Sequence, residues 1–132
     1  MKKIVIIVLT VILLTGCVKK IGEEPKLSDL QYTVLPEQDV PEEFAAKIED
    51  AKAAPFTFTY ADQGYMYIAR GYGAQPTSGY SISVENLYDT ENTICFETSL
   101  IGPRQSEKTK EVECYPYIVV KMEYMDKEVM FE

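Results

Sequence analysis

The hydrophobic positions along the chain recur at two different spacings. In the first half of the chain, Phe44, Ile48 and Ala51 are three or four residues apart, which places them on one face of a helix. Pro41 suits the first turn of such a helix, and Pro55 stops it because its ring cannot continue the hydrogen-bond ladder. The pattern predicts one α-helix whose apolar face packs on a sheet.

After this helix the hydrophobic period changes to two, which is the period of a β-strand. Five alternating runs follow, at residues 56–60, 65–70, 80–87, 93–101 and 111–124. The first two are separated by a glycine-containing turn and predict a hairpin, and Pro116 predicts a bulge or a sheet edge in the last. We therefore expect a mainly β domain over residues 31–132, as a small antiparallel β-sandwich or a curled sheet with one N-terminal α-helix.

The first sixteen residues are a basic start followed by an apolar run. Two lysines precede the run at residues 4–14, and the sequence Leu-Thr-Gly then leads to Cys17. The run is shorter than the roughly 20 residues of a spanning helix, so we interpret residues 1–16 as a secretory signal peptide. The order Leu-Thr-Gly-Cys resembles the bacterial lipobox. This resemblance implies that Cys17 receives a diacylglycerol and begins the mature protein.

A lipid on Cys17 predicts a protein held at the cell membrane on its extracytoplasmic side. We interpret residues 17–30 as a lipidated tether because they are polar and lack a sustained hydrophobic period. At about 3.3 to 3.6 Å per residue, the tether could hold the domain up to about 45 Å from the bilayer.

The exported chain is strongly acidic. Loss of the two N-terminal lysines takes 13 basic residues to 11 against 21 acidic ones, and the formal charge from -8 to -10. Such a surface repels nucleic acid and anionic headgroups. We expect no nucleic-acid partner, and we expect the lipid to provide the membrane attachment.

The chain contains no histidine. This removes Ser-His and Cys-His pairs, imidazole bases and most zinc sites. A serine activated by Lys121 stays open, but the run Gly-Tyr-Ser-Ile-Ser around Ser81 lacks the second glycine of a nucleophile elbow. The acidic run at Asp89 lacks the length and central glycine of a calcium loop. We expect a protein without enzymatic activity, cofactor, metal or small-molecule substrate.

Cys95 and Cys114 remain as an even pair in an exported protein once Cys17 carries lipid. If the fourth and fifth predicted strands formed a hairpin, the two cysteines would lie opposite each other at a separation that a disulfide can span. Against this, Cys95 shares the strand face of Glu97 rather than that of the apolar residues beside it. A structural disulfide and two free thiols both remain open.

A turn-rich stretch, Gly-Ala-Gln-Pro-Thr-Ser-Gly-Tyr at residues 73–80, leads directly into the third predicted strand. Pro76 fixes one backbone dihedral, Thr77 and Ser78 can bond to nearby backbone amides, and Gly79 permits a backbone that a Cβ would obstruct. A stiff loop loses little entropy on docking into another protein. The alternative is an ordinary strand connection. The candidate partner-binding residues are Gln75, Pro76, Thr77, Ser78, Gly79 and Tyr80.

Three stretches of the chain share a pattern with one known family. They are residues 32–52, 65–84 and 114–122, and the most specific parts are Gly71, Pro-Thr-Ser-Gly-Tyr-Ser-Ile at 76–82 and Tyr-Pro-Tyr at 115–117. On these motifs the chain resembles the C-terminal domain family of the protease complex subunit PrcB. Members usually carry glycine where this chain has Ser78. The resemblance implies a non-catalytic lipoprotein that binds and stabilises a subtilisin-like surface protease.

The same loop is similar to the Asn-Pro-Thr-Thr-Gly-Tyr loop that chagasin-type cysteine protease inhibitors insert into the enzyme cleft. Gln75 stands in place of the asparagine, and the chain has no tryptophan and no Arg-Pro-Trp counterpart. Three hypotheses therefore stay open: an accessory subunit that binds or stabilises a protease, a protease inhibitor, and a structural envelope lipoprotein with no protease partner.

Overall fold

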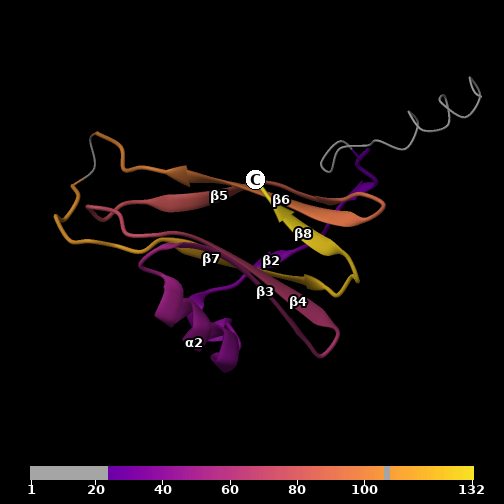
Figure 1. The fold of residues 1–132 in the computed structure, drawn as a ribbon. Helices are drawn as coiled ribbons and strands as arrows, with labels where there is room; N and C mark the ends of the chain where they lie inside the picture. The colour runs from indigo at the N-terminus through magenta and orange to yellow at the C-terminus, as the bar shows by residue number, and fades with distance from the viewer. Residues whose placement is uncertain (1–23, 106–107) are drawn as a thin grey trace, which may run out of the picture.

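The computed structural model describes residues 24–105 and 108–132 (Figure 1). The predicted signal peptide and Cys17 lie outside these ranges. Within them, the chain forms two four-stranded sheets and one short α-helix. This confirms the prediction of a mainly β fold with a helix near its start, and a two-sheet sandwich is formed rather than a single curled sheet.

The first sheet has the order β1-β5-β6-β8. Its strands are β1 (Ser28–Asp29), β5 (Ser81–Asp89), β6 (Thr93–Ile101) and β8 (Glu128–Phe131). The second sheet has the order β2-β7-β4-β3. Its strands are β2 (Thr33–Val34), β7 (Tyr117–Glu123), β4 (Tyr65–Tyr72) and β3 (Pro55–Asp62). Neighbouring strands are antiparallel except β6 and β8, which run parallel.

The sandwich core lies between the two sheets. Ile68 and Val120 of the second sheet are buried against Ile94 and Phe96 of the first. Strand β5 contributes Ile82, Val84 and Leu87 to the same core. A register shift between Val84 and Asn86 inserts one extra residue in β5, and such a bulge returns Leu87 to the buried face.

The helix covers the other face of the second sheet. It is α2 (Glu42–Ala51), preceded by the 3-10 helix η1 (Glu37–Asp39). Phe44 and Ile48 are buried against Phe56, Tyr67 and Val119 of the sheet, as their spacing predicts. The second sheet is therefore the middle of three layers, with α2 on one side and the first sheet on the other (Figure 1).

The predicted hairpin of β3 and β4 is present. Its two-residue turn, Gln63-Gly64, has positive φ angles of 50° and 82°, as a type I′ hairpin turn requires. The fifth predicted strand is shorter than expected. Strand β7 begins at Tyr117, just after Pro116, and pairs with β4 rather than with β6.

The structure places two short segments in the first sheet that the sequence pattern did not assign to strands. Strand β8 follows β7, and β1 lies inside the segment interpreted as tether. The Leu27 N–H donates to the Asp89 carbonyl at 2.8 Å, and the Leu30 N–H to the Leu87 carbonyl at 3.0 Å. The tether boundary at residue 30 is therefore corrected, since residues 27–30 pair with β5.

A membrane-spanning helix was also sought in the described residues. No helix there is long and apolar enough to cross a bilayer.

Candidate functional site

Three connections meet at one end of the sandwich. They are the β4–β5 loop that contains residues 75–80, the β6–β7 connection and the end of the α2–β3 connection (Figure 1). The Ala74 N–H donates to the Ala53 carbonyl at 3.3 Å, and Gln75 forms an antiparallel bridge with Cys114. The 75–80 loop is therefore packed between two other segments rather than isolated in solvent.

The 75–80 loop is held mainly by the β6–β7 connection. Gln75 N–H donates to the Cys114 carbonyl at 2.8 Å, and Cys114 N–H returns a bond to the Gln75 carbonyl at 3.0 Å. Ser78 N–H donates to the Lys110 carbonyl at 3.0 Å, and Lys110 N–H donates to Ser78 Oγ at 2.9 Å. The Cys114 thiol donates to the Thr77 carbonyl at 2.9 Å. These contacts make the loop stiff.

The origin of this stiffness differs from the prediction. Thr77 and Ser78 were expected to bond to nearby backbone amides, but Ser78 Oγ accepts from the distant Lys110, and Thr77 Oγ1 donates to the Ser78 carbonyl at 3.1 Å. Glycine in place of Ser78 would keep the backbone bond to the Lys110 carbonyl but would lack the Oγ that accepts from the Lys110 N–H. Gly79 has a φ of 93°, which confirms that this position needs a residue without a Cβ.

The loop offers a narrow exposed tip. Pro76 and Gly79 are exposed, while Gln75, Thr77, Ser78 and Tyr80 are half-buried. The Tyr80 ring lies over Gly102, where an added Cβ would be 3.6 Å from its Cε1 atom. The surface that the loop offers to another molecule is therefore the Pro76 turn and the Gly79 backbone, with Tyr80 as lateral support.

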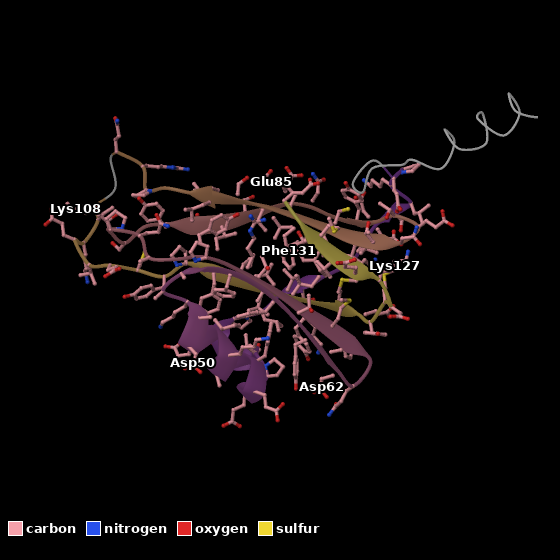
Figure 2. The ribbon with its side chains drawn as sticks, viewed as in Figure 1. Asp50, Asp62, Glu85, Lys108, Lys127 and Phe131 are labelled. Atoms are coloured by element: carbon pink, nitrogen blue, oxygen red, sulfur yellow. The ribbon has the colours of Figure 1, made fainter. Side chains whose placement is uncertain are left out.

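The two ends of the sandwich differ in their basic side chains (Figure 2). Arg104, Lys108 and Lys110 are exposed in the β6–β7 connection, beside the 75–80 loop. At the opposite end lies Lys127, whose Nζ is 2.9 Å from Asp89 Oδ2 and 2.7 Å from the Thr90 carbonyl. Three basic side chains that form no ion pair among the described residues therefore lie beside the loop of this acidic protein.

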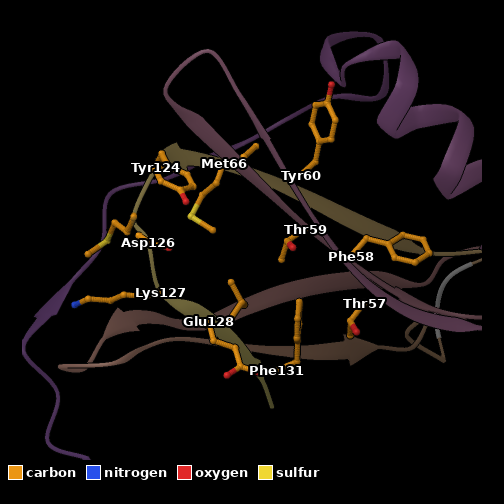
Figure 3. A pocket seen from close by; sticks show the side chains of 13 residues that line it. Thr57, Phe58, Thr59, Tyr60, Met66, Tyr124, Asp126, Lys127, Glu128 and Phe131 are labelled. Carbon is orange, nitrogen blue, oxygen red and sulfur yellow. The ribbon is translucent and has the colours of Figure 1, made fainter.

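A separate hollow opens along one side of the sandwich, between β3 and β8 (Figure 3). It has a volume of about 380 Å³ and is lined by Thr57 and Thr59 of β3, Met66 of β4, and Val129 and Phe131 of β8. Sequence analysis did not identify this hollow, because β8 was not recognised as a strand.

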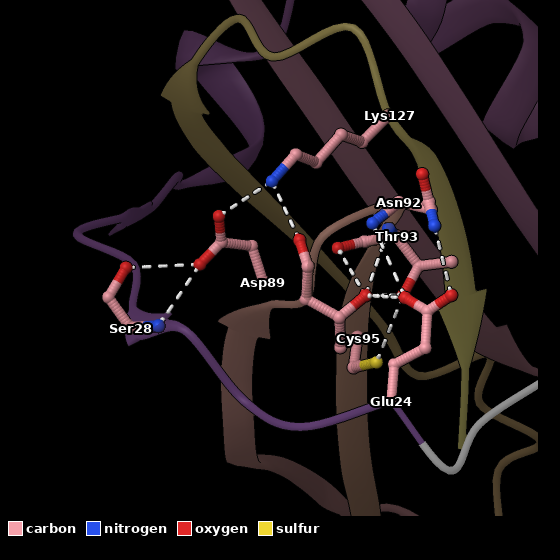
Figure 4. Close-up of polar contacts among 8 residues, drawn as sticks. Glu24, Ser28, Asp89, Asn92, Thr93, Cys95 and Lys127 are labelled. Carbon is pink, nitrogen blue, oxygen red and sulfur yellow. Dashed lines mark hydrogen bonds and ion pairs between the residues drawn. The ribbon is translucent and has the colours of Figure 1, made fainter.

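The end opposite the loop holds the N-terminal segment (Figure 4). The Glu24 carboxylate accepts hydrogen bonds from Thr90 Oγ1 at 2.7 Å and from the Asn92 Nδ2 and N atoms at 3.1 and 3.3 Å. Asp89 Oδ1 accepts from Ser28 Oγ at 3.0 Å and from Ser28 N at 3.2 Å. The hydrogen bonds from Lys127 and Ser28 lower the pKa of Asp89, against the opposing effect of burial.

The structure corrects the arrangement on which a Cys95–Cys114 disulfide depended. Strands β6 and β7 belong to different sheets, so they do not form the hairpin that would place the cysteines opposite each other. Cys95 is buried in β6 between Tyr88 and Met130 in register, and Cys114 pairs with Gln75. Both thiols are free.

The fold and the loop together define a small three-layered β domain whose candidate site is a braced loop surface at one end. Residues 66–123 match the family model described as PrcB C-terminal. The chain therefore carries a PrcB C-terminal domain over these residues, which contain the 75–80 loop and its bracing segment. Comparison with curated proteins and with solved structures gave no match.

Proposed function

We propose that this protein is a membrane-anchored, extracytoplasmic binding domain that contacts a secreted or surface protease through the 75–80 loop. The observation that supports this most directly is the state of the loop in the free chain. Five hydrogen bonds already connect it to Cys114 and Lys110. A loop ordered before binding loses little conformational entropy when it docks.

The position of the loop also fits this proposal. Glu24 holds the N-terminal segment at the β5–β6 turn, and the loop lies at the other end of the sheets (Figures 1 and 4). With a lipid on Cys17, the loop would face away from the bilayer, where a large soluble partner has access. A partner class is suggested by the PrcB family to which residues 66–123 belong.

A role in stabilising a protease and a role in inhibiting it make different kinetic predictions. The full lipidated chain in detergent would be added to subtilisin-class protease from the same cell envelope. A stabilising subunit lengthens the active half-life of the protease and leaves its initial rates unchanged. An inhibitor lowers initial rates in proportion to its concentration. If neither occurs and a pull-down from the envelope recovers no protease, the proposal is wrong.

The contact itself is tested with a change at the exposed tip. Pro76→Asp adds a carboxylate at a residue whose side chain makes no bond within the loop among the described residues. Burying that charge in an interface should weaken binding about tenfold or more. Gln38→Asp adds the same charge on the exposed η1 and serves as the control. Equal affinity for the two variants would reject the loop as the contact.

A further inference from the structure

Strand β3 is an unprotected sheet edge. It is last in the order β2-β7-β4-β3, and its eight residues pair with β4 without a register shift. Natural sheet edges are usually shielded by charged side chains, by prolines, by bulges or by a short strand length. Pro55 and Asp62 stand only at the two ends of the strand, and residues 56–61 contain no proline and no charged side chain. Within the described part of the chain, no strand pairs with the outer side of β3.

The ladder pattern identifies which backbone groups of β3 face outward. The Tyr72 N–H donates to the Pro116 carbonyl on the β7 side. Because bonding direction alternates along an antiparallel strand, the odd-numbered residues of β4 bond to β3. They pair with the even-numbered residues of β3, as the Asp62–Tyr65 pair that closes the turn requires. Thr57, Thr59 and Ala61 therefore direct their N–H and C=O groups away from the sheet.

The side chains of the same residues border the hollow between β3 and β8. Thr57 and Thr59 project toward Phe131, whereas Tyr60 projects the other way, toward α2 (Figure 3). Phe58 packs with Tyr60 against the cluster that contains Phe44 and Ile48 of α2. Opposed residues of an antiparallel pair lie on the same face of a sheet. A strand added to β3 would therefore direct alternate side chains into the hollow.

The charged residues around the β3 edge and the hollow indicate the chemistry of the segment that would bind there. Asp62, Asp126 and Glu128 are exposed at the end of β3 near the turn. The nearby Lys127 does not neutralise them, because its Nζ is bound to Asp89 and Thr90. A second copy of this chain carries the same strongly negative net charge, formally -8 over the full sequence and -10 without the two N-terminal lysines, and this repulsion disfavours self-pairing.

We infer that β3 is a strand-addition site for an extended segment of a partner protein. The segment pairs with Thr57, Thr59 and Ala61, places small aliphatic side chains in the hollow, and carries a lysine or arginine next to Asp62. Main-chain bonds supply the affinity in this mode of recognition, and the pockets for alternate side chains supply the specificity. The site is separate from the 75–80 loop, so each can fail without the other.

The probe is an acetylated, fluorescently labelled peptide as long as β3, with alternating valine and threonine and a lysine at each end. Binding to the full lipidated chain in detergent is measured by anisotropy, and amide hydrogen exchange locates the contact. We expect slower exchange at Thr57, Thr59 and Ala61. The same peptide N-methylated along its centre lacks the required donors and should not bind. Binding of both peptides alike, or no protection of these amides at about 1 mM peptide, would overturn the inference.

Two variants of Thr59 distinguish the contribution of its backbone N–H to peptide binding from that of its side chain. Thr59→Pro removes an outward N–H that β4 does not use, while Thr59→Val keeps this N–H and replaces the hydroxyl with a methyl group. We expect Thr59→Pro to weaken peptide binding about fivefold to tenfold, and Thr59→Val to change it by about twofold at most. Pro76→Asp in the loop should not change the affinity for the peptide.

Sedimentation of the wild-type chain without peptide tests for a second copy as the occupant. A dimer that Thr59→Pro abolishes would also contradict the inference.

Discussion

Gln75 and Cys114 exchange both of their backbone hydrogen bonds, at N···O distances of 2.8 and 3.0 Å. The Cys114 thiol adds a third bond, to the Thr77 carbonyl at 2.9 Å. A residue near the end of the β6–β7 connection thus fixes the start and the middle of the 75–80 loop. The conformation of the loop depends on a segment that is distant in the sequence.

The first prediction concerns this brace. Cys114→Ala removes the thiol donor but keeps the backbone pair, and we expect it to cost about 1 kcal/mol of unfolding free energy and to speed amide exchange at Ser78. Cys114→Ser keeps a donor at the same position and should lose less. Urea unfolding and hydrogen exchange measure the two effects. Identical exchange in all three proteins would mean that the thiol does not stabilise the loop.

The second prediction concerns the oxidation state of the cysteines. In the Cys17→Ala chain, unfolding in an alkylating reagent without reductant should add two alkyl groups, because Cys95 and Cys114 are free and separate. In the folded chain the half-buried Cys114 should react before the buried Cys95. Mass spectrometry of the intact chain measures the number of alkyl groups, and mass spectrometry of its peptides shows which cysteine reacts first. A chain that takes up no alkyl group before reduction would contradict the fold at these positions.

The third prediction concerns Gly71. A Cβ at this position would lie 2.1 Å from Cε1 of Phe56, whose ring is buried and stacks on Phe58 with centroids 4.9 Å apart. Gly71→Ala should therefore force the ring to move and destabilise the fold by about 1 to 3 kcal/mol.

Gly71→Ala combined with Phe56→Leu provides the control for this prediction, because the smaller side chain leaves room for the methyl group. The double variant should lose less stability than the two single changes added together. Thermal unfolding of all four proteins measures this coupling. Strict additivity would show that the ring does not cause the loss.

The fourth prediction is a pH dependence of stability at the end of the sandwich opposite the loop. Hydrogen bonds from Lys127 and Ser28 lower the pKa of Asp89 in the folded chain. A lowered folded pKa means that the contribution of Asp89 is complete above its unfolded value, near pH 4, and is lost as the pH falls through the folded pKa. Urea midpoints of wild type and Asp89→Asn should therefore converge below about pH 4.

Lys26 supplies the comparison for this pH effect. It also pairs with an aspartate, Asp29, at 2.6 Å, but that pair is exposed. Exposed pairs contribute little to stability, so Lys26→Gln should have nearly the same urea midpoint as wild type at every pH. A difference between wild type and Asp89→Asn that stays constant from pH 2 to 7 would contradict the assignment to this carboxylate.

Local pattern was sufficient to predict much of this fold. The spacing of Phe44 and Ile48 predicted the buried face of α2, and the alternation around the Gln-Gly turn predicted the β3–β4 hairpin. Both depend on residues close in sequence. The pairing of β7 with β4 instead of β6 depends on which sheet a long connection enters, and no local period encodes that choice.

The same distinction explains the candidate site. Gly79 was predicted correctly from the needs of its own backbone. The bracing contacts of Lys110 and Cys114 were missed because they join residues of different loops. Strand β8 was missed because its four residues are too few to show a period. The hollow between β3 and β8 was therefore missed as well.

The fifth prediction concerns the orientation of the domain at the membrane. Because Glu24 is held at the β5–β6 turn by Thr90 and Asn92, the length of chain from Cys17 to Glu24 limits their separation to at most about 25 Å. The nine residues of β5 then span about 30 Å from that turn toward the loop end. With the lipid in place, we expect the loop end to be the part of the domain farthest from the bilayer.

This orientation is measured with a fluorescent amino acid placed at either end of the domain. Glu91 is exposed at the turn near the tether, and Thr109 is exposed in the segment beside the 75–80 loop. On vesicles with quencher-labelled headgroups, the probe at Glu91 should be quenched and the probe at Thr109 much less so, because quenching falls steeply with distance. Cys17→Ala should remove the quenching at both sites. Equal quenching of the two probes on the lipidated chain would mean that the domain lies flat on the membrane, and the loop would then lack the access that the proposed partner needs.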